Sequence, residues 1–208
     1  MKDKERKLTE KELKRKTHFE VLRAEMQERG YTEKPLIVGI VEANVWAAVI
    51  MLPFIIAAGI LFFAVNSIGS EISLRFSALL LPVMLIMIVL HELIHGLVWG
   101  CFARNHFSSI EFGVIWKALT PYCTCSEPLT KWQYVLGGAM PTLVLGFGLA
   151  AAAAATGQLV MLLLAELMIL SGGGDFLIIL KILLYRPGHR EVVYYDHPYE
   201  CGVVAFER

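Results

Sequence analysis

Two histidines and a glutamate in the run His-Glu-Leu-Ile-His, namely His91, Glu92 and His95, have the spacing of a metal site. On a helix, residues four apart lie one above the other, so both imidazoles project from the same face. Two such imidazoles suit two positions of a tetrahedral zinc site. Glu92 is rotated by roughly 100° from His91, where its carboxylate can act as general base on a water held by the metal. The spacing therefore predicts a zinc site with His91 and His95 as ligands and Glu92 as the catalytic base.

This motif lies in a long apolar segment, residues 79–100, in which Leu, Ile, Val and Met predominate. Ionisable side chains are costly in sequence of this kind and are usually functional where they occur. The simpler alternative is that the three side chains hydrogen-bond inside a helix bundle without a metal.

The whole chain has the composition of a membrane protein, because 56% of its 208 residues are hydrophobic and its mean hydropathy is +0.58. A helix needs about 20 apolar residues to cross a bilayer. Four segments meet this requirement, and the last two are joined so closely at Gly157 that they should form an antiparallel pair. The expected spans are residues 43–65, 76–102, 134–156 and 158–185.

Positive charges are distributed unevenly along the chain, with 11 of the 19 Lys and Arg in residues 1–34. The loop between the first two spans has only Arg75, whereas the next loop has Arg104, Lys117 and Lys131. Because cytoplasmic loops carry the excess of positive charge, both termini and the long loop should face the cytoplasm. Cysteines on that reducing side are expected to form no disulfide. No basic patch with interleaved aromatics occurs, so nucleic acid is not an expected partner.

A catalytic zinc usually has three protein ligands and one open position, and Asp175 is the leading candidate for the third ligand. At about 1.5 Å per residue, His91 and Asp175 lie roughly 22 and 25 Å from the outer ends of their spans. Asp175 also follows Ser-Gly-Gly-Gly, and glycines permit a helix break or the close approach of another helix. The alternative is a glycine-packed crossing in which Asp175 accepts hydrogen bonds from its neighbours. Weaker ligand candidates are Glu166, Cys101, His106, His18, His189 and His197.

The charged N-terminal segment predicts a helix of its own. Thr9 and Glu12 have the spacing of a capping box, and Gly30 is a plausible stop, so the helix should cover residues 10–29. We expect this helix to be mainly solvated, although it could also lie on the membrane surface or dock on the rest of the protein.

The loop between the second and third spans, residues 108–128, is rich in β-branched and aromatic residues and predicts one or two short strands. An exposed strand edge beside a zinc site could bind a peptide substrate by strand addition, but a hairpin that only caps the bundle explains the pattern equally well.

Cys123 and Cys125 could suggest a second metal site, but a single C-x-C lacks the paired spacing of structural zinc sites. Small residues at 137–141 open the third span, where they could form one wall of the active-site cleft or simply allow close packing.

Four pieces of this sequence are unusual in combination: residues 91–96, residues 121–128, Ala-Met-Pro at 139–141, and Gly174-Asp175 followed by Lys181. Together they resemble a bacterial family of uncharacterised membrane zincin peptidases, related to the site-2-protease-like intramembrane metalloproteases, over roughly residues 80–196. The resemblance implies a bacterial cell membrane, zinc on His91 and His95, Glu92 as general base and Asp175 as the intramembrane carboxylate ligand. Site-2 proteases usually carry that aspartate in an Asn-Pro-Asp-Gly-like or Leu-Asp-Gly setting, which Gly-Gly-Gly-Asp-Phe-Leu does not match.

The sequence thus predicts an all-α integral membrane protein with about four transmembrane helices, a short β-hairpin-like cytoplasmic loop and a charged N-terminal helix. Residues 1–36 would be a cytoplasmic N-terminal segment, residues 37–186 the four-span metalloprotease domain, and residues 187–208 a cytoplasmic tail.

The expected function is that of a Zn²⁺ metalloendopeptidase acting in or near the lipid bilayer on a membrane protein or peptide; no oligomeric state is implied. One alternative is a zinc-binding membrane scaffold or regulator without proteolytic activity. Another is a small transporter subunit in which His91, Glu92 and Asp175 line a proton or metal path, although the sequence lacks the internal repeat common in transporters.

Overall fold

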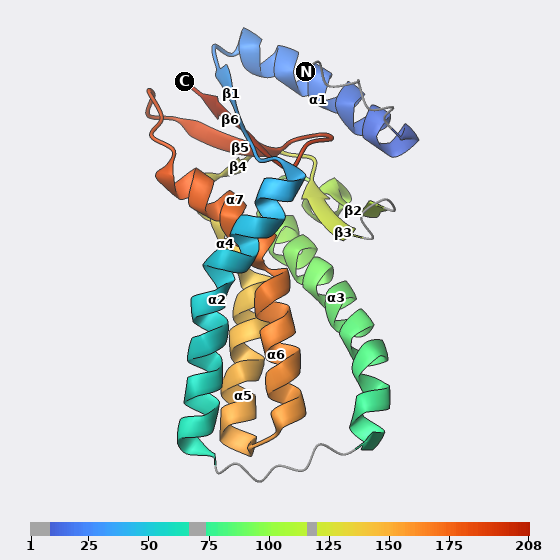
Figure 1. Cartoon of the computed structure of the whole chain (residues 1–208). Helices are drawn as coiled ribbons and strands as arrows, with labels where there is room; N and C mark the ends of the chain where they lie inside the picture. The colour runs from blue at the N-terminus through green and yellow to red at the C-terminus, as the bar shows by residue number, and fades with distance from the viewer. Residues whose placement is uncertain (1–8, 67–73, 116–119) are drawn as a thin grey trace.

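A computed structural model of the protein describes residues 9–66, 74–115 and 120–208, so Lys117 lies outside the described residues. A bundle of helices forms one end of the molecule, and strands with the N-terminal helix form the other (Figure 1). Helix α1 and the C-terminus lie at the strand end, opposite the connection between α5 and α6. In chain order the helical segments are α1 (Glu10–Glu28), α2 (Ile40–Val65), α3 (Leu74–Phe102), η1 (His106–Ser109), α4 (Lys131–Pro141), η2 (Thr142–Gly148), α5 (Leu149–Thr156), α6 (Leu159–Ser171) and α7 (Gly173–Leu184).

Among the described residues, three helical segments are long and apolar enough to cross a membrane, or four if the bent pair α6 and α7 counts as one span. The three segments are residues 41–65, 80–102 and 131–156, close to the first three expected spans. The third is continuous through α4, the π-helical turn η2 and α5. It ends at Gly157, whose left-handed φ of 70° starts the tight connection to α6 that the sequence predicts.

The molecule is mostly helical, as the sequence predicts, but it also contains a small β-sheet that the prediction of an all-α fold did not include. A four-stranded antiparallel sheet has the order β1-β6-β5-β4, with β1 at Thr32–Ile37, β4 at Leu129–Thr130, β5 at Val192–Asp196 and β6 at Gly202–Glu207. The segment expected to be a C-terminal tail therefore supplies the two central strands. Each of these strands is an apolar run of only five or six residues between Pro, Gly and charged residues, and so short a run gives a much weaker signal than the long apolar helices.

The expected hairpin between the second and third long helices is confirmed. Strands β2 (Ile110–Ile115) and β3 (Thr120–Cys125) pair antiparallel as a separate two-stranded sheet, with Phe112 opposite Cys123. The hairpin packs on the last turns of α3, where a Cβ at Gly96 would lie 2.5 Å from Cζ of Phe112. Glycine at this position therefore permits the hairpin to contact the helix that carries the histidines.

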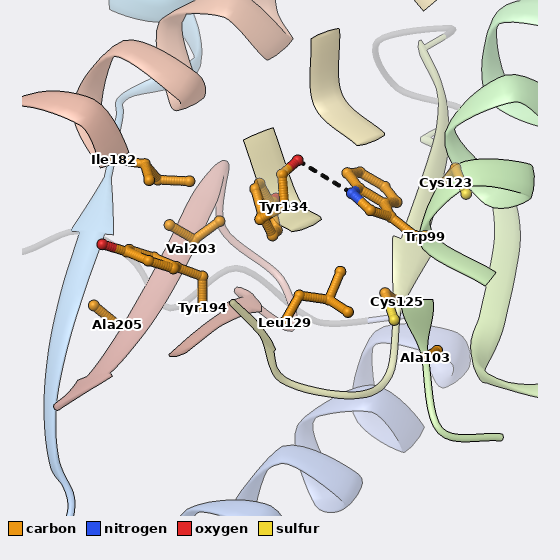
Figure 2. Close-up of a cluster of buried hydrophobic side chains, with 10 residues drawn as sticks. All are labelled: Trp99, Ala103, Cys123, Cys125, Leu129, Tyr134, Ile182, Tyr194, Val203 and Ala205. Carbon is orange, nitrogen blue, oxygen red and sulfur yellow. Dashed lines mark hydrogen bonds between the residues drawn. The ribbon is translucent and has the colours of Figure 1, made fainter. Parts of the chain in front are cut away.

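A buried core joins the sheets to the helices. Trp99 of α3 and Tyr134 of α4 meet Tyr194 of β5 and Val203 of β6, while Cys123 and Cys125 pack from the hairpin (Figure 2). Because the indole N–H of Trp99 also donates to the backbone oxygen of Tyr134 at 3.2 Å, α3 and α4 are fixed to each other at the level of the sheet.

The N-terminal helix begins and ends close to the predicted residues; most of its residues are exposed, as expected, but one face docks on the sheet. Its capping box is present, because the Thr9 side chain accepts from the backbone of Glu12 and the Glu12 carboxylate accepts from the backbone of Thr9. Phe19 and Met26 are buried against Tyr195, Val204 and Phe206 of the sheet. These two apolar side chains are about two turns apart on the same face of α1. Most other residues of the helix are charged or polar, so the sequence offers little indication that the helix docks on the sheet.

Candidate metal centre

The long helix α3 and the bent helix α7 bring three candidate ligands to one point. His91 and His95 lie one turn apart on α3 and are both buried, and Asp175 lies in the first turn of α7. Oδ2 of Asp175 is 3.1 Å from Nε2 of His91 and 3.3 Å from Nε2 of His95. Among the described residues, these three form the one group whose ligand atoms could hold a metal ion, with all three atoms within 4.8 Å of one another.

The glycines before Asp175 allow α7 to reach this position. The axes of α6 and α7 are bent by 43° at Gly172. A Cβ at Gly172 would lie 1.8 Å from Oγ1 of Thr142, and one at Gly173 would lie 2.7 Å from Cβ of Ala47 and 2.9 Å from its backbone oxygen. Both positions therefore permit close contact with neighbouring helices, as the sequence predicts for this run.

The distances between the three side chains fit a tetrahedral zinc ion. With Zn–N and Zn–O distances of about 2.0–2.2 Å, neighbouring ligand atoms around a tetrahedral zinc are about 3.3–3.6 Å apart. The two measured separations from Asp175, 3.1 and 3.3 Å, are close to this spacing. The donor set of two imidazoles and one carboxylate is one that catalytic zinc sites use, and it leaves a fourth position open.

The ring of His95 is oriented by α4. Its Nδ1 lies 2.9 Å from the backbone oxygen of Gly137, and because a carbonyl only accepts, Nδ1 carries the proton. The lone pair of Nε2 is then directed toward Asp175. Trp99 stacks on a face of the His95 ring, with centroids 5.0 Å apart and planes at 16°. Such outer contacts fix the tautomer and orientation of metal-binding histidines.

Fewer contacts orient the ring of His91 than that of His95. Its ring lies edge-on to that of His95, with centroids 4.9 Å apart. Among the described residues, its buried Nδ1 has no hydrogen-bond partner. The orientation of His91 therefore depends on packing and on its contact with Asp175.

Glu92 is half-buried beside the two histidines and contacts the hairpin. Its carboxylate lies beside the backbone of Cys123 on β3. This contact places the edge of β3 next to the residue that the sequence predicts as general base. The strand expected near the metal site is therefore adjacent to Glu92, but this edge is not free to pair with a peptide, because the N–H of Cys125 donates to Asp196 and both cysteines are buried.

The weaker ligand candidates lie elsewhere. Cys101 is exposed on α3, and a Cβ at Gly59 of α2 would lie 3.5 Å from Oε1 of Glu166, so that glutamate faces α2. All four cysteines have free thiols, and burial raises the pKa values of Cys123 and Cys125, the latter to about 12. None of the six weaker candidates belongs to the group of potential metal ligands found among the described residues.

Four further residues support the site but were not predicted to do so. Gly137 supplies a backbone oxygen, Trp99 a stacking surface, and Tyr134 and Asp196 the hydrogen bonds behind them. Gly137 was assigned only to packing or to a cleft wall, and Asp196 to a tail. A backbone carbonyl leaves no signal in the sequence, and the pairing of Asp196 with a residue 62 positions away depends on the sheet.

The sequence profile of one protein family, described as "Putative zincin peptidase", matches residues 84–189, about half of the chain. The matched segment contains His91, Glu92, His95 and Asp175. No curated protein and no solved structure matches this chain.

Proposed function

Because the chain belongs to the family described as "Putative zincin peptidase", we propose that it is a zinc metalloendopeptidase that cleaves peptide bonds in or near a membrane. The observation that carries this proposal is the convergence of Nε2 of His91, Nε2 of His95 and Oδ2 of Asp175 with the spacing of zinc ligands. In this proposal these three residues hold Zn²⁺ and Glu92 acts as general base.

When bound, zinc would supply Lewis acidity that activates a water and polarises the scissile carbonyl. Glu92 would accept the proton of the attacking water and deliver it to the leaving amine. The backbone of Cys123 limits the positions open to the Glu92 carboxylate, and Gly137 and Trp99 hold the His95 ring.

The exposed apolar side chains of the long helices support a membrane location. Val41 and Ile60 on α2 and Leu81 on α3 are each more than 60% exposed, which favours contact with lipid over contact with water. In this proposal the sheets and α1 lie at the cytoplasmic surface, and both termini are cytoplasmic, as the charge distribution predicts. The metal centre would then lie near the cytoplasmic end of the bundle, where α3 meets the hairpin.

The zinc content of the purified protein tests this proposal directly. Wild type should contain about one zinc per chain, and His95→Ala and Asp175→Ala should each lose it, because a site with two ligands binds zinc weakly. Glu166→Gln is the matched control, since it removes an intramembrane carboxylate outside the site and should retain zinc. Equal zinc in wild type and both ligand variants would refute the assignment, and loss in His95→Ala alone would place the third ligand elsewhere.

A further inference from the structure

One carboxylate in the C-terminal segment contacts both elements that support the metal centre. Asp196, the last residue of β5, accepts the backbone N–H of Cys125 on its Oδ2 at 2.9 Å. Its Oδ1 accepts the hydroxyl of Tyr134 on α4. The two oxygens of this side chain therefore connect the four-stranded sheet to β3 and to α4 at once.

The connection through β3 leads to Glu92. Cys123 and Cys125 are two residues apart on β3, so their backbone groups point to the same side of the strand. That side faces away from β2, because Cys125 donates to Asp196 whereas the next residue, Ser126, donates to Ser109 beside β2. The Glu92 carboxylate lies beside the Cys123 backbone. Asp196 therefore fixes β3 two residues from the point where this strand contacts the general base.

The connection through α4 leads to His95 by two routes. The backbone oxygen of Tyr134 accepts the indole N–H of Trp99 at 3.2 Å (Figure 2). The Trp99 ring in turn stacks on His95. Gly137, three residues after Tyr134 on the same helix, supplies the carbonyl that accepts from Nδ1 of His95. A movement of Tyr134 would therefore displace both groups that orient the His95 ring.

We propose that Asp196 is a positioning residue of the metal centre, which holds β3 and α4 in the arrangement that orients Glu92 and His95. This inference rests on the proposed zinc function of the site. It also gives the four-stranded sheet a role in that function. Asp196 belongs to β5, β5 pairs with β6, and β6 pairs with β1 of the N-terminal segment.

An Asp196→Asn variant tests the proposal with Co²⁺ alone as the probe. The amide keeps the shape of the carboxylate but is uncharged, and with its oxygen toward Cys125 its N–H faces the Tyr134 hydroxyl, so that hydrogen bond is reversed and both bonds lose their charged acceptor. We expect Co²⁺ to bind about tenfold more weakly, as for other groups that orient ligands, and we expect its visible absorption spectrum to change because the ligand geometry has changed. Tyr134→Phe should produce a smaller change in the same direction, and adding it to Asp196→Asn should cause little further loss.

Glu191 offers a matched control just before β5. It also accepts from a tyrosine, Tyr31, and from the guanidinium of Arg208 at 2.6 Å, but these contacts join residues that flank β1, β5 and β6 and involve neither β3 nor α4. Glu191→Gln should lower the thermal stability of the protein without changing Co²⁺ affinity or the spectrum. A purely structural role of Asp196 would predict the same behaviour for Asp196→Asn.

The possible outcomes separate this inference from the proposed function. If wild type binds no Co²⁺, or binds it equally well after His95→Ala, the zinc site itself is wrong. If binding depends on His95 but Asp196→Asn retains the wild-type affinity and spectrum, the positioning role is wrong. If Asp196→Asn does not fold, Tyr134→Phe decides, because it removes one of the same hydrogen bonds and leaves the carboxylate in place; an unchanged spectrum in that variant would overturn the proposal.

Discussion

Nδ1 of His95 donates to the backbone oxygen of Gly137 at 2.9 Å, although 42 residues separate them in the chain. The bond determines which nitrogen of the ring faces Asp175, so the ligand geometry of α3 depends on the position of α4. The helices can approach this closely because residue 137 has no side chain, and a Cβ there would lie 2.1 Å from Cδ1 of Trp99.

Two adjacent glycines on α4 should respond differently to substitution. Gly137→Ala forces Trp99 away from its place on the His95 ring, and we expect it to cost about 1–3 kcal/mol of stability, typical of overpacking, and to weaken metal binding. Gly138→Ala is the control, because its Cβ would meet the flexible end of Ile179 at 3.2 Å. Thermal unfolding and Co²⁺ titration of both variants measure the difference. Equal metal affinity in the two would show that the contact with Trp99 does not orient the ligand.

The glycine run before Asp175 provides a second pair. Gly173→Ala would place a Cβ 2.9 Å from the backbone oxygen of Ala47, which a rotamer change cannot relieve. Gly174→Ala meets nothing within 4 Å and should be neutral or stabilise the protein by up to about 1 kcal/mol, because alanine favours the helix. Thermal unfolding should therefore separate Gly173→Ala from Gly174→Ala. Similar losses in both would mean that α7 does not need its close contact with α2.

The sequence predicts the three ligand residues because each prediction depends only on the position of a residue along a helix. The pair His91 and His95 follows from helical spacing, and Asp175 from comparing its depth with that of His91 along two parallel spans. The contacts behind the ligands cannot be predicted from the sequence. Every residue has a backbone carbonyl, so nothing distinguishes the one at Gly137, and Asp196 reaches Tyr134 only because a long-range sheet forms. The long apolar helices could be predicted because the hydropathy of a 20-residue segment is a strong signal. The central strands β5 and β6 could not, because each is an apolar run of only five or six residues.

Glu92→Gln should separate metal binding from catalysis. The amide cannot act as general base, but residue 92 is not among the three proposed ligands, so zinc content should equal that of wild type. Loss of general-base catalysis typically costs about 10²–10⁴-fold in rate. New N-termini of membrane proteins, labelled in cells that express wild type or the variant, should appear with wild type only. A zinc-binding scaffold would function equally well with either residue, and a transporter would instead show uptake in proteoliposomes without cleavage.

The docking of α1 should depend on Phe19, which is 2% exposed and packs against Tyr195 with ring centroids 5.4 Å apart. Replacing a buried Phe by Ala typically costs about 3–5 kcal/mol, so Phe19→Ala should release α1 from the sheet. Because α1 is rich in Lys and Arg, trypsin should then cleave it faster than in wild type. Val21→Ala is the control on the same helix, since Val21 is exposed. Equal cleavage rates in the two variants would show that α1 is not held by this contact.

The stability of the sheet end should fall between neutral and mildly acidic pH because of His197. Burial, and to a smaller extent the charge of Arg23, lower the pKa of His197 from 6.5 to about 4. Its Nδ1 accepts the backbone N–H of Glu200 at 2.9 Å, which requires that this nitrogen carry no proton. Between pH 6.5 and 4 the unfolded chain therefore binds a proton that the folded protein does not, so the free energy of unfolding decreases as the pH falls through this window.

His197→Asn keeps an acceptor for Glu200 without a titrating group, and its Tm should fall less than that of wild type between pH 7 and pH 5. Parallel decreases in Tm for the two proteins would assign the pH dependence to other groups.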